Sequence, residues 1–393
     1  MPQSARDKKY LGREGKPRAL RVVRSKGAYI YDEKGKRYID FVMGWCVGNI
    51  GWNVRQVVAH IKKFNGPTYV MPSYFYRGWE TLAELLAKLA PGRLVKSFRA
   101  TGGTEAVEIA LQAAMAHTKR HKFISIEGSY HGHSIAAMSV GSSDFRSWYR
   151  NLLPHCYKIR LPLNEAAAKK VVALLAKRDI AAFIIEPIIC NLAVEIPSQA
   201  FITTVRKACR KYGTLFIADE VGTGFGRTGK MFASEHFKLD PDIMTVAKGV
   251  SGGYGALGAA LMTKEVAQSF EFEFSYYSTF GWHPLSVEAT IQNLRYLVKH
   301  RAVFFRNAAR LSAYFEKRLR AMRFKYPAEI RVKGLAIGVI FSRDGYGAEI
   351  IARCLKAGLL IADATSRSIV IYPPLNLDMT TAKKGLDILE SAL

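Results

Sequence analysis

Four short apolar runs, separated by amphipathic stretches, restrict the fold of this chain more than any other feature of its sequence. The runs are "KFISI" (122–126), "AAFIIEP" (181–187), "GTLFIADE" (213–220) and "PDIMTVAK" (241–248). Strands that are apolar along nearly their whole length are buried on both faces, as in parallel sheets covered by helices. Residues 164–178 and 198–213 have the amphipathic pattern of such helices. The sequence therefore predicts an α/β fold with a mainly parallel central sheet covered by helices.

The two ends of the chain predict a second, smaller domain. Residues 27–41, "GAYIYDEKGKRYIDF", alternate apolar and polar side chains around a "DEKGK" turn, which is a hairpin signal. Residues 284–325 have the pattern of one long helix that leads out of the sheet domain. We expect residues 1–60 and 291–393 to form this small α+β domain together, with a large domain over 61–290 between them.

The strongly basic composition raises the question of a nucleic-acid partner. Lysine and arginine outnumber aspartate and glutamate by 58 to 32, which gives a formal net charge of +26. Such a surface attracts anions in general, including nucleic acid and acidic metabolites. The basic residues are spread along the whole chain, however, and no helix-turn-helix, zinc-finger or RNP-type motif accompanies them. We therefore expect no specific nucleic-acid partner.

The cysteines and the hydropathy pattern indicate an intracellular protein. The five cysteines are scattered, without CxxC or Cys/His spacing. This pattern predicts free thiols in a reducing cytosol and no metal site. No run of eighteen apolar residues and no apolar core of signal-peptide length is present. We expect a cytoplasmic protein without a membrane segment.

A glycine pair directly before a helical pattern indicates a phosphate site. In "RATGGTEAVEIALQAAMAHTKR" (99–120), Gly102, Gly103 and Thr104 precede a run with the apolar spacing of a helix. Small residues at a helix start leave backbone N–H groups open, and the helix dipole adds partial positive charge there. A phosphate fits at this start, with the Thr104 hydroxyl as a further donor. Taken alone, such a loop is more often purely structural.

Two of the apolar runs end in charged residues. Asp219 ends the run 213–220, and Lys248 ends the next run, one strand–helix–strand step later. The carboxyl ends of parallel strands form the edge of a sheet at which ligands bind. A carboxylate there can pair with a cationic ring nitrogen, and a poorly solvated lysine can form a Schiff base with an aldehyde. The glycines after Lys248, in "GVSGGYG", are expected to leave space for the ligand.

A phosphate-binding helix start, a carboxylate for a ring nitrogen and a lysine for an aldehyde are together what pyridoxal phosphate requires. The motifs "TGGTEAVE", "GSYHGHSIAAMSVG", "IIEPI", "IADEVGTGFGRTGKMF", "VAKGVSGG" and "STFGWHPLS" extend this picture. With them the chain resembles a class III (subgroup II) aminotransferase of pyridoxal-phosphate fold type I. The resemblance runs from about residue 24 to residue 377, nearly the whole chain.

The resemblance implies how the chain holds the cofactor. Gly103 and Thr104 would bind the phosphate, Tyr130 of "SYHG" would stack on the pyridine ring, and Val221 would pack behind that ring. In the resembled family, the equivalent of Asp219 pairs with the ring nitrogen. Lys248 would then be the Schiff-base lysine and the proton shuttle.

The resemblance also implies a dimer. Thr279 of "STFG" would reach the phosphate of the neighbouring subunit's cofactor. The active unit would therefore be a homodimer with the active site at the subunit interface. Its partners would be a small-molecule amine donor and a keto or aldehyde acceptor.

Three positions depart from the family members that act on ornithine-like or 4-aminobutyrate-like substrates. Such members carry an arginine where this chain has His133, and a glutamate paired with an arginine where it has Asn191 and Val370. Both members of that pair are missing together, which avoids a lone buried charge. Arginine binds a carboxylate through a two-pronged fork that histidine and valine do not reproduce. We therefore expect weak activity with ornithine and 4-aminobutyrate.

Other positions combine features of two branches of the family. "YHGH", Asn191 and Trp45 are similar to glutamate-1-semialdehyde aminomutases, whereas "GFGRTG" is typical of ordinary aminotransferases. Trp45, His133 and Asn191 are therefore candidates for the substrate pocket. The further aromatic residues Trp52, Tyr74 and Tyr76 are candidates for its walls.

The predicted function is transfer of an amino group through a Schiff base on Lys248. A pyridoxal-phosphate-dependent isomerase, either an aminomutase or an amino-acid racemase, is the alternative, since it would use the same lysine, aspartate and phosphate loop. A catalytically silent protein that binds nucleic acid through its basic surface is a third hypothesis, which rests on charge alone.

Overall fold

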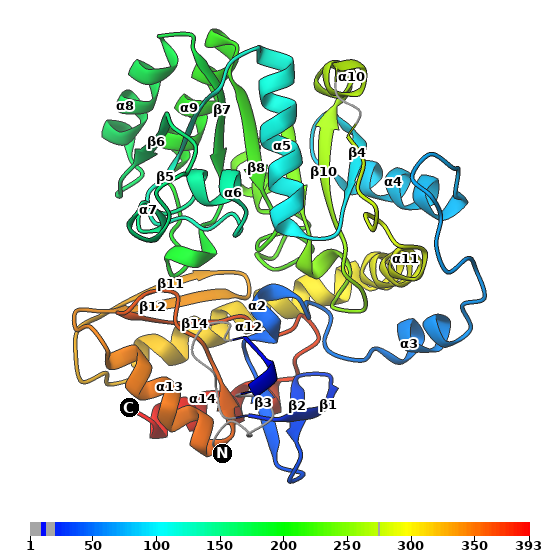
Figure 1. Ribbon diagram of the computed structural model, residues 1–393. Coiled ribbons are helices and arrows are strands. Elements are labelled where there is room, and N and C mark those ends of the chain that lie inside the picture. Colours follow the sequence, from blue (N-terminus) through cyan, green and yellow to red (C-terminus); the bar gives the residue numbers. More distant parts are fainter. Residues whose placement is uncertain (1–8, 13–19, 274–275) are drawn as a thin grey trace.

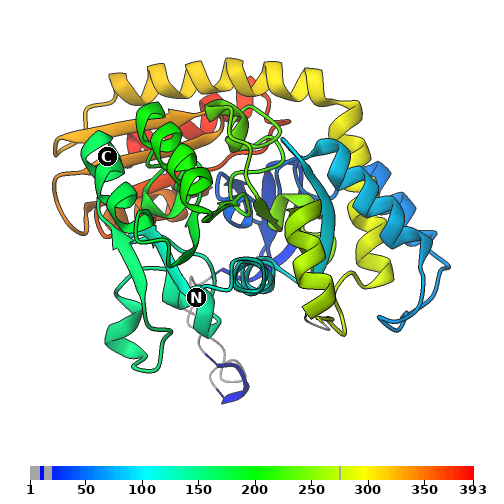
Figure 2. The same cartoon turned by 90° about the horizontal axis from the view of Figure 1, so that it is seen from above.

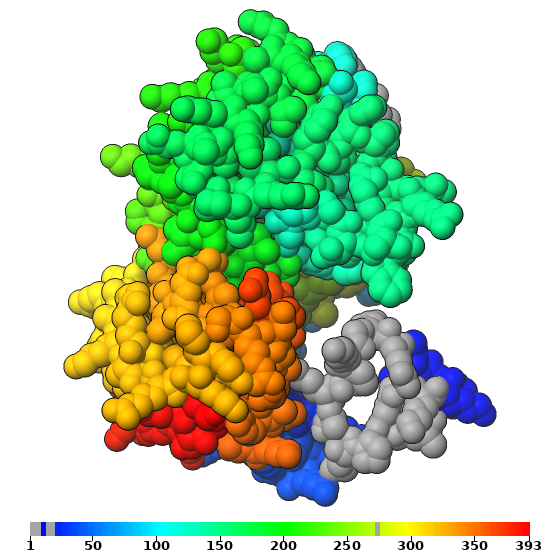
Figure 3. Space-filling model, turned by 90° about the vertical axis from the view of Figure 1, so that its left-hand side faces the viewer, coloured from blue at the N-terminus to red at the C-terminus, as the bar shows by residue number. Residues whose placement is uncertain are grey.

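A computed structural model describes residues 9–12, 20–273 and 276–393 and shows two lobes (Figure 1). The larger lobe contains the central sheet, and the smaller lobe combines segments from both ends of the chain. The space-filling view shows the large lobe, in green, directly above the yellow-to-red C-terminal segment (Figure 3). No helix of the described ranges is both long and apolar enough to cross a membrane.

Seven strands form the central sheet, in the order β4-β10-β9-β8-β7-β5-β6. They are β4 (Leu94–Ala100), β5 (Lys122–Ile126), β6 (Cys156–Ile159), β7 (Ile180–Ile185), β8 (Leu215–Asp219), β9 (Ile243–Val246) and β10 (Gly258–Thr263). Strand β10 is antiparallel to β4 and β9, and the other pairs of this sheet are parallel. The predicted mainly parallel sheet is confirmed, and each of the four apolar runs forms one of its strands.

Helices cover both faces of this sheet (Figure 2). Helix α5 (Gly103–Thr118) packs on one face, against Ile184 and Ile217, whereas the next residues on the same strands pack with α8 (Glu165–Leu175) and α9 (Gln199–Tyr212) on the other. Because successive side chains of a strand point to opposite faces, an all-apolar strand needs a cover on both sides. The two helices predicted at 164–178 and 198–213 are α8 and α9.

The remaining helical elements connect the strands or cover the sheet edges. They are α2 (Met43–Cys46), α3 (Arg55–Lys62), α4 (Arg77–Leu89), α6 (Ile135–Val140), α7 (Phe145–Trp148), α10 (Lys264–Glu273) and the short 3-10 turns η1 (Cys190–Leu192), η2 (Ala233–Phe237) and η3 (Lys248–Val250). The turns η1 and η3 follow β7 and β9 at their carboxyl ends, so they lie at the sheet edge where the site is predicted.

The single helix predicted over 284–325 is wrong, because the chain forms two helices there. Helix α11 (Pro284–Lys299) ends at His300, where φ is −102° and ψ is 10°, and α12 (Arg301–Ala321) begins at the next residue. Helix α11 packs against α4 beside the sheet, whereas α12 packs against β11 and α14 of the small lobe. The apolar pattern continues through His300 because both helices are amphipathic, and the break allows each to bury its face in a different lobe.

Two small sheets build the second lobe. One has the order β1 (Val22–Lys26), β2 (Tyr29–Asp32), β3 (Arg37–Asp40), β13 (Leu359–Leu360), and the other has the order β11 (Ala328–Lys333), β12 (Ala336–Phe341), β14 (Ser368–Ile371). The helices α13 (Tyr346–Ala357) and α14 (Met379–Ser391) complete this lobe. The predicted hairpin is present as β2 and β3. Parallel pairing of β13 with β3 ties the C-terminal segment to the N-terminal one, while the domain boundaries after residues 60 and 290 stay predictions.

Candidate active site

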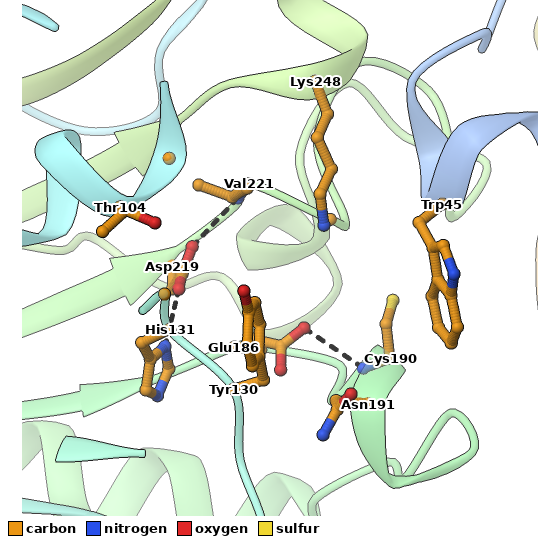
Figure 4. A pocket seen from close by; sticks show the side chains of 13 residues that line it. Trp45, Thr104, Tyr130, His131, Glu186, Cys190, Asn191, Asp219, Val221 and Lys248 are labelled. Carbon is orange, nitrogen blue, oxygen red and sulfur yellow. Dashed lines mark hydrogen bonds and ion pairs between the residues drawn. The ribbon is translucent and has the colours of Figure 1, made fainter. Parts of the chain in front are cut away.

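Eight of the residues singled out from the sequence line one cavity of about 420 Å³ (Figure 4). They are Trp45, Gly103, Thr104, Tyr130, Asn191, Asp219, Val221 and Lys248. The cavity lies where the carboxyl ends of the parallel strands meet the start of α5, the place at which open α/β sheets bind ligands. Thr279 and His133 do not line it.

Neighbouring strands bring Asp219 and Lys248 together. Asp219 is the last residue of β8, and Lys248 begins η3, two residues after β9. The two strands are parallel, with Asp219 opposite Thr245. Lys248 has a left-handed φ of 48°, and its side chain extends into the cavity between Val221 and Trp45 (Figure 4). The carboxylate of Asp219 and the amine of Lys248, at the ends of two apolar runs, therefore line the same cavity.

The glycines after Lys248 do not leave space for a ligand, which corrects the expectation from the sequence. A Cβ at Gly249 would lie 2.6 Å from Asn49 Nδ2, and one at Gly252 would lie 2.4 Å from Asn293 Oδ1. Asn293 Nδ2 in turn donates hydrogen bonds to the carbonyls of Gly249 and Val250. These glycines allow the turn to pack closely against two asparagines, which fixes the backbone that carries Lys248.

The carboxylate of Asp219 is buried and held on both oxygens. The residue is 2% exposed. Its Oδ2 lies 2.6 Å from His131 Nδ1, and its Oδ1 accepts hydrogen bonds from Thr245 Oγ1 at 2.9 Å and from the Val221 amide at 3.1 Å. Three partners fix the orientation of this acid. His131 was not predicted from the sequence, although it directly follows Tyr130 in the "SYHGH" motif and its polarity was a usable signal.

The start of α5 is open to the cavity. The N-cap residue of this sixteen-residue helix is Gly102. Glycine has no side chain, so the N-cap residue does not occupy the first N–H groups of the helix. A Cβ at Gly103 would lie 2.9 Å from Val221 Cγ1, and one at Gly132 would lie 2.6 Å from Thr104 Oγ1. Only glycine allows these close approaches. The arrangement is suited to a phosphate.

A second cavity lies beside the helix start and contains Thr279. It measures about 580 Å³, and Thr279 and Phe280 line it together with Gly103 and Thr104 of the same chain. The structure therefore brings Thr279 next to the predicted phosphate-binding residues but not into the cavity that holds Asp219 and Lys248.

Tyr130 lies in the cavity and His133 lies outside it. The Tyr130 hydroxyl is 2.8 Å from His133 Nδ1, and the His133 ring also contacts Phe145 edge-on. His133 therefore supports Tyr130 and does not line the substrate pocket, contrary to expectation. Burial raises the pKa of Tyr130, and the positive charge of Lys248 opposes this shift.

Glu186, which received no role from the sequence, also lines the cavity. It is 5% exposed, its Oε2 accepts a hydrogen bond from the Cys190 amide at 3.2 Å, and its Oε1 has no hydrogen-bond partner. Burial raises the pKa of this carboxyl well above its usual range, and the charge of Asp219 raises it further. The side chain therefore binds its proton more tightly than an ordinary glutamate, and its Oε1 is open to a ligand. The motif "IIEPI" was the signal that pointed to it.

Among the four aromatic candidates for the pocket, Trp45 alone lines the cavity. Its ring packs against Tyr372 at 5.7 Å. Trp52 donates from Nε1 to Asp40 Oδ2, and the hydroxyl of Tyr76 donates to Glu288. Tyr74 is 64% exposed and also lies outside the cavity. Composition could not separate these residues, because their positions depend on contacts between distant segments.

The cavity contains one cationic side chain, Lys248, among the described residues that line it. Val370 is fully buried in β14. Arg367 is largely exposed, 3.8 Å from Asp344, and does not line the cavity. No group of three or more histidine, cysteine, aspartate or glutamate side chains in the described ranges could hold a metal ion.

The residues present fit pyridoxal phosphate. The open start of α5 suits the phosphate, the fixed carboxylate of Asp219 suits a cationic ring nitrogen, and the Lys248 amine suits the aldehyde. All three groups face one cavity. In the sequence, the helix start, the aspartate and the lysine were each a weak signal when taken alone. Their presence around one cavity is what points to pyridoxal phosphate.

Comparisons with known proteins agree with this geometry. The family model described as aminotransferase class-III matches residues 10–393. The chain is 31% identical to the acetylornithine aminotransferase of Archaeoglobus fulgidus over 387 residues, which cover 98% of each chain. It is 33% identical to the acetylornithine aminotransferase of Bacillus subtilis over 375 residues, which cover 95% of this chain and 94% of that protein.

Solved structures have the same fold. An aminotransferase of Bacillus anthracis superposes with a TM-score of 0.90 at 25% identity, with 99% of this chain and 97% of that chain covered. The omega transaminase of Pseudomonas jessenii in complex with PMP gives a TM-score of 0.92 at 24% identity, with the same coverage. The relatives are aminotransferases, so they do not favour the isomerase alternative. Over nearly its whole length, this chain belongs to the class III aminotransferases and is a pyridoxal-phosphate-dependent transaminase.

Proposed function

We propose that this enzyme moves an amino group from an amine with an uncharged substituent to a keto or aldehyde acceptor. The observation that carries the proposal is a cavity in which Lys248 is the one cation among the described lining residues. Trp45 supplies an apolar wall, and Asn191, whose Nδ2 donates to the Gly128 carbonyl at 3.2 Å, supplies a neutral polar one. A substrate carboxylate beyond the reacting amine has no guanidinium to pair with among the described residues that line the cavity.

The residues of the cavity divide the work of transamination. Pyridoxal phosphate, when bound, supplies an aldehyde that captures amines and a ring that withdraws electrons. Lys248 Nζ would bind that aldehyde at rest and, once released, would accept and return the proton of the donor's α-carbon. Asp219 would keep the ring nitrogen protonated, with its oxygens fixed by His131 and Thr245.

The other residues of the cavity would fix the position of the cofactor's phosphate and ring. Gly103 and Thr104 would bind its phosphate at the start of α5. Tyr130 would cover the ring, and Val221, in contact with Gly103, would pack behind it. The carboxyl of Glu186 would present its unpartnered Oε1 to the ligand in the cavity.

Substrate preference tests the proposal directly. With pyruvate as acceptor, 1-phenylethylamine should be turned over at least about tenfold more efficiently, in kcat/KM, than ornithine or 4-aminobutyrate. A missing bidentate charge pair costs roughly 1.4 kcal/mol or more, which is this factor. Steady-state rates for the three amines on one enzyme preparation provide the measurement, with N-acetylornithine as a fourth arm. A preference for ornithine, N-acetylornithine or 4-aminobutyrate would reveal a carboxylate clamp and refute the proposal.

We also propose that the enzyme is a cytoplasmic homodimer with its active sites at the subunit interface. Several large apolar side chains of the segments 69–75 and 277–280 are exposed in the single chain, and the rings of Tyr69 and Phe280 join the two segments. The exposed side chains are Tyr69, Met71, Tyr74, Phe75, Tyr277 and Phe280. An exposed apolar patch of this kind favours a protein interface. The five cysteines are free thiols, as expected in a reducing compartment.

A single substitution at Phe75, which is 95% exposed, should separate the subunits. The wild-type protein should have twice the 43.8 kDa mass of the chain by light scattering after gel filtration, and Phe75→Glu should shift it towards the monomer, because a charge opposite apolar surface is poorly solvated. Trp148→Glu is the matched control, since Trp148 is 82% exposed on α7 and lies away from this patch. A monomeric wild type, or equal loss of dimer in both variants, would contradict the proposal.

A further inference from the structure

Asn293 of α11 packs against the turn that carries Lys248. Its Nδ2 donates hydrogen bonds to the carbonyl of Val250 at 2.8 Å and to the carbonyl of Gly249 at 3.1 Å. The residue is fully buried and does not line the active-site cavity. The mechanism above gives this side chain no role. A residue outside the cavity is therefore bonded to the two residues that directly follow Lys248.

The amide group of Asn293 has one orientation that the turn allows. Nδ2 carries two hydrogens, and its two hydrogen bonds use both of them. Oδ1 is buried and has no hydrogen-bond partner. The reverse orientation would place Oδ1 against two carbonyl oxygens, which accept hydrogen bonds and cannot donate them. Burying an unpaired carbonyl is unfavourable, so an asparagine at this buried position is explained if the turn needs its two donors.

The turn needs support because its own bonds are few and its backbone is unusual. The 3-10 turn η3 has three residues, and Lys248 has a left-handed φ of 48°, which is unfavourable for a residue with a side chain. The Lys248 carbonyl accepts from the amides of Ser251 and Gly252, each at 3.2 Å. An unfavourable backbone conformation persists only where the surrounding structure holds it. Asn293 provides such a hold from a sixteen-residue helix.

The second asparagine at this turn makes a different contribution. Asn49 Nδ2 donates to the carbonyls of Gly224 and Phe225, which belong to another loop, and it touches the turn through its close approach to Gly249. Asn293 instead bonds to the turn itself. Its helix α11 also packs against α3 and α4, which gives the turn a fixed support.

We propose that Asn293 is a positioning residue for transamination, which holds the turn so that the Lys248 amine enters the cavity at the required place. The proposal rests on the proposed role of Lys248. A displacement of about 1 Å in a reacting group can lower a rate by about 10²-fold. Gly103, Thr104 and Asp219 lie on other elements, so the binding of the cofactor's phosphate and ring should not depend on Asn293.

Asn293→Leu removes both donors and keeps a side chain of similar size. We expect kcat to fall between about tenfold and a hundredfold with little change in KM, because the amine moves and the pocket walls do not. In a pH titration of the visible absorption band of the lysine-bound cofactor, the midpoint should move by about half a pH unit or more, because the charges near the bound nitrogen depend on its position.

Hydrogen exchange measures the turn directly and needs no turnover. In the Asn293→Leu holoenzyme, the peptide over residues 249–255 should exchange its amide hydrogens faster than in the wild type, since the turn has lost its hold. Asn293→Ser is a second variant in case the leucine variant does not fold. It keeps a hydroxyl donor on a shorter side chain, so it should give smaller changes in the same directions.

Thr214→Val is the matched control. Thr214 is also buried and donates from Oγ1 to a backbone carbonyl of another segment, that of Ile180, at the opposite end of β8 from Asp219. This variant should lower the melting temperature and leave the absorbance titration and the exchange of 249–255 unchanged. Unchanged titration and exchange in a folded Asn293 variant, or equal changes in Thr214→Val, would overturn the proposal. Failure of the Lys248 assignment would appear separately, as a visible band that persists in Lys248→Ala.

Discussion

Lys248→Ala is expected to abolish transamination and leave the fold intact. Lys248 supplies the one amine among the described residues of the cavity, so its loss removes both the group that binds the aldehyde and the group that moves the α-proton. The residue already has a left-handed φ of 48°, and alanine introduces no bulk there. Protein mixed with pyridoxal phosphate should lose the visible absorption band of the lysine-bound cofactor, and multiple turnover should fall below detection.

Lys158 offers a matched control for this experiment. It is also a largely buried lysine, and burial lowers its pKa to about 8, but it donates hydrogen bonds to Ser125 Oγ and the Ser139 carbonyl outside the cavity. Lys158→Met should keep the absorption band and the turnover of each folded molecule. Multiple turnover at the wild-type rate in Lys248→Ala would refute the assignment of Lys248, as would loss of the band in Lys158→Met alone.

Asp219→Asn is expected to reduce kcat by roughly 10³-fold, the scale of a lost electrostatic contact in an enzyme interior. Asparagine keeps the shape and can still accept hydrogen bonds from Thr245 and the Val221 amide, but it carries no charge to oppose a cationic ring nitrogen. The phosphate and lysine contacts should persist, so the variant should still bind the cofactor. Steady-state kinetics, together with a thermal melt, separate the loss of rate from a loss of stability.

Asp242→Asn is the corresponding control. Asp242 forms a two-pronged ion pair with Arg206 at 2.6 and 2.9 Å, at the opposite end of β9 from Lys248. This substitution should lower the melting temperature and change kcat little. A loss of less than about tenfold in Asp219→Asn would mean that another acid holds the ring nitrogen. Glu186 would then be the first residue to examine, because it is the other carboxyl in the cavity.

The strands that carry the site were predictable because their signal is local. Continuous apolar character forces β8 and β9 into the interior, so the charged residues at their ends had to emerge at a sheet edge. The three remaining strands of the central sheet were missed for equally physical reasons. Strands β4 and β6 lie at the two edges of the sheet, so they carry polar side chains that are partly exposed. Strand β10 follows closely after a glycine-rich turn, which interrupts the apolar pattern before it.

The contacts of the residues that line the cavity were not predictable, because each contact joins segments that are far apart in the sequence. The pairing of His131 with Asp219 depends on a loop after β5 crossing the end of β8. The raised pKa of Glu186 depends on burial that several segments create together. The side chain of His133 lies outside the cavity, where it contacts Tyr130 and Phe145.

By itself, the sequence determined the α/β class, the glycine-containing helix start and the presence of an aspartate and a lysine at the ends of neighbouring strands. Periodicity and residue type act over a few positions, and the parallel sheet then aligns the ends of neighbouring strands without further information. Only the tertiary structure decided which aromatic residue lines the cavity, where the long helix breaks, and that His131 contacts Asp219. These features arise where segments distant in the sequence pack together, and no single segment encodes that packing alone.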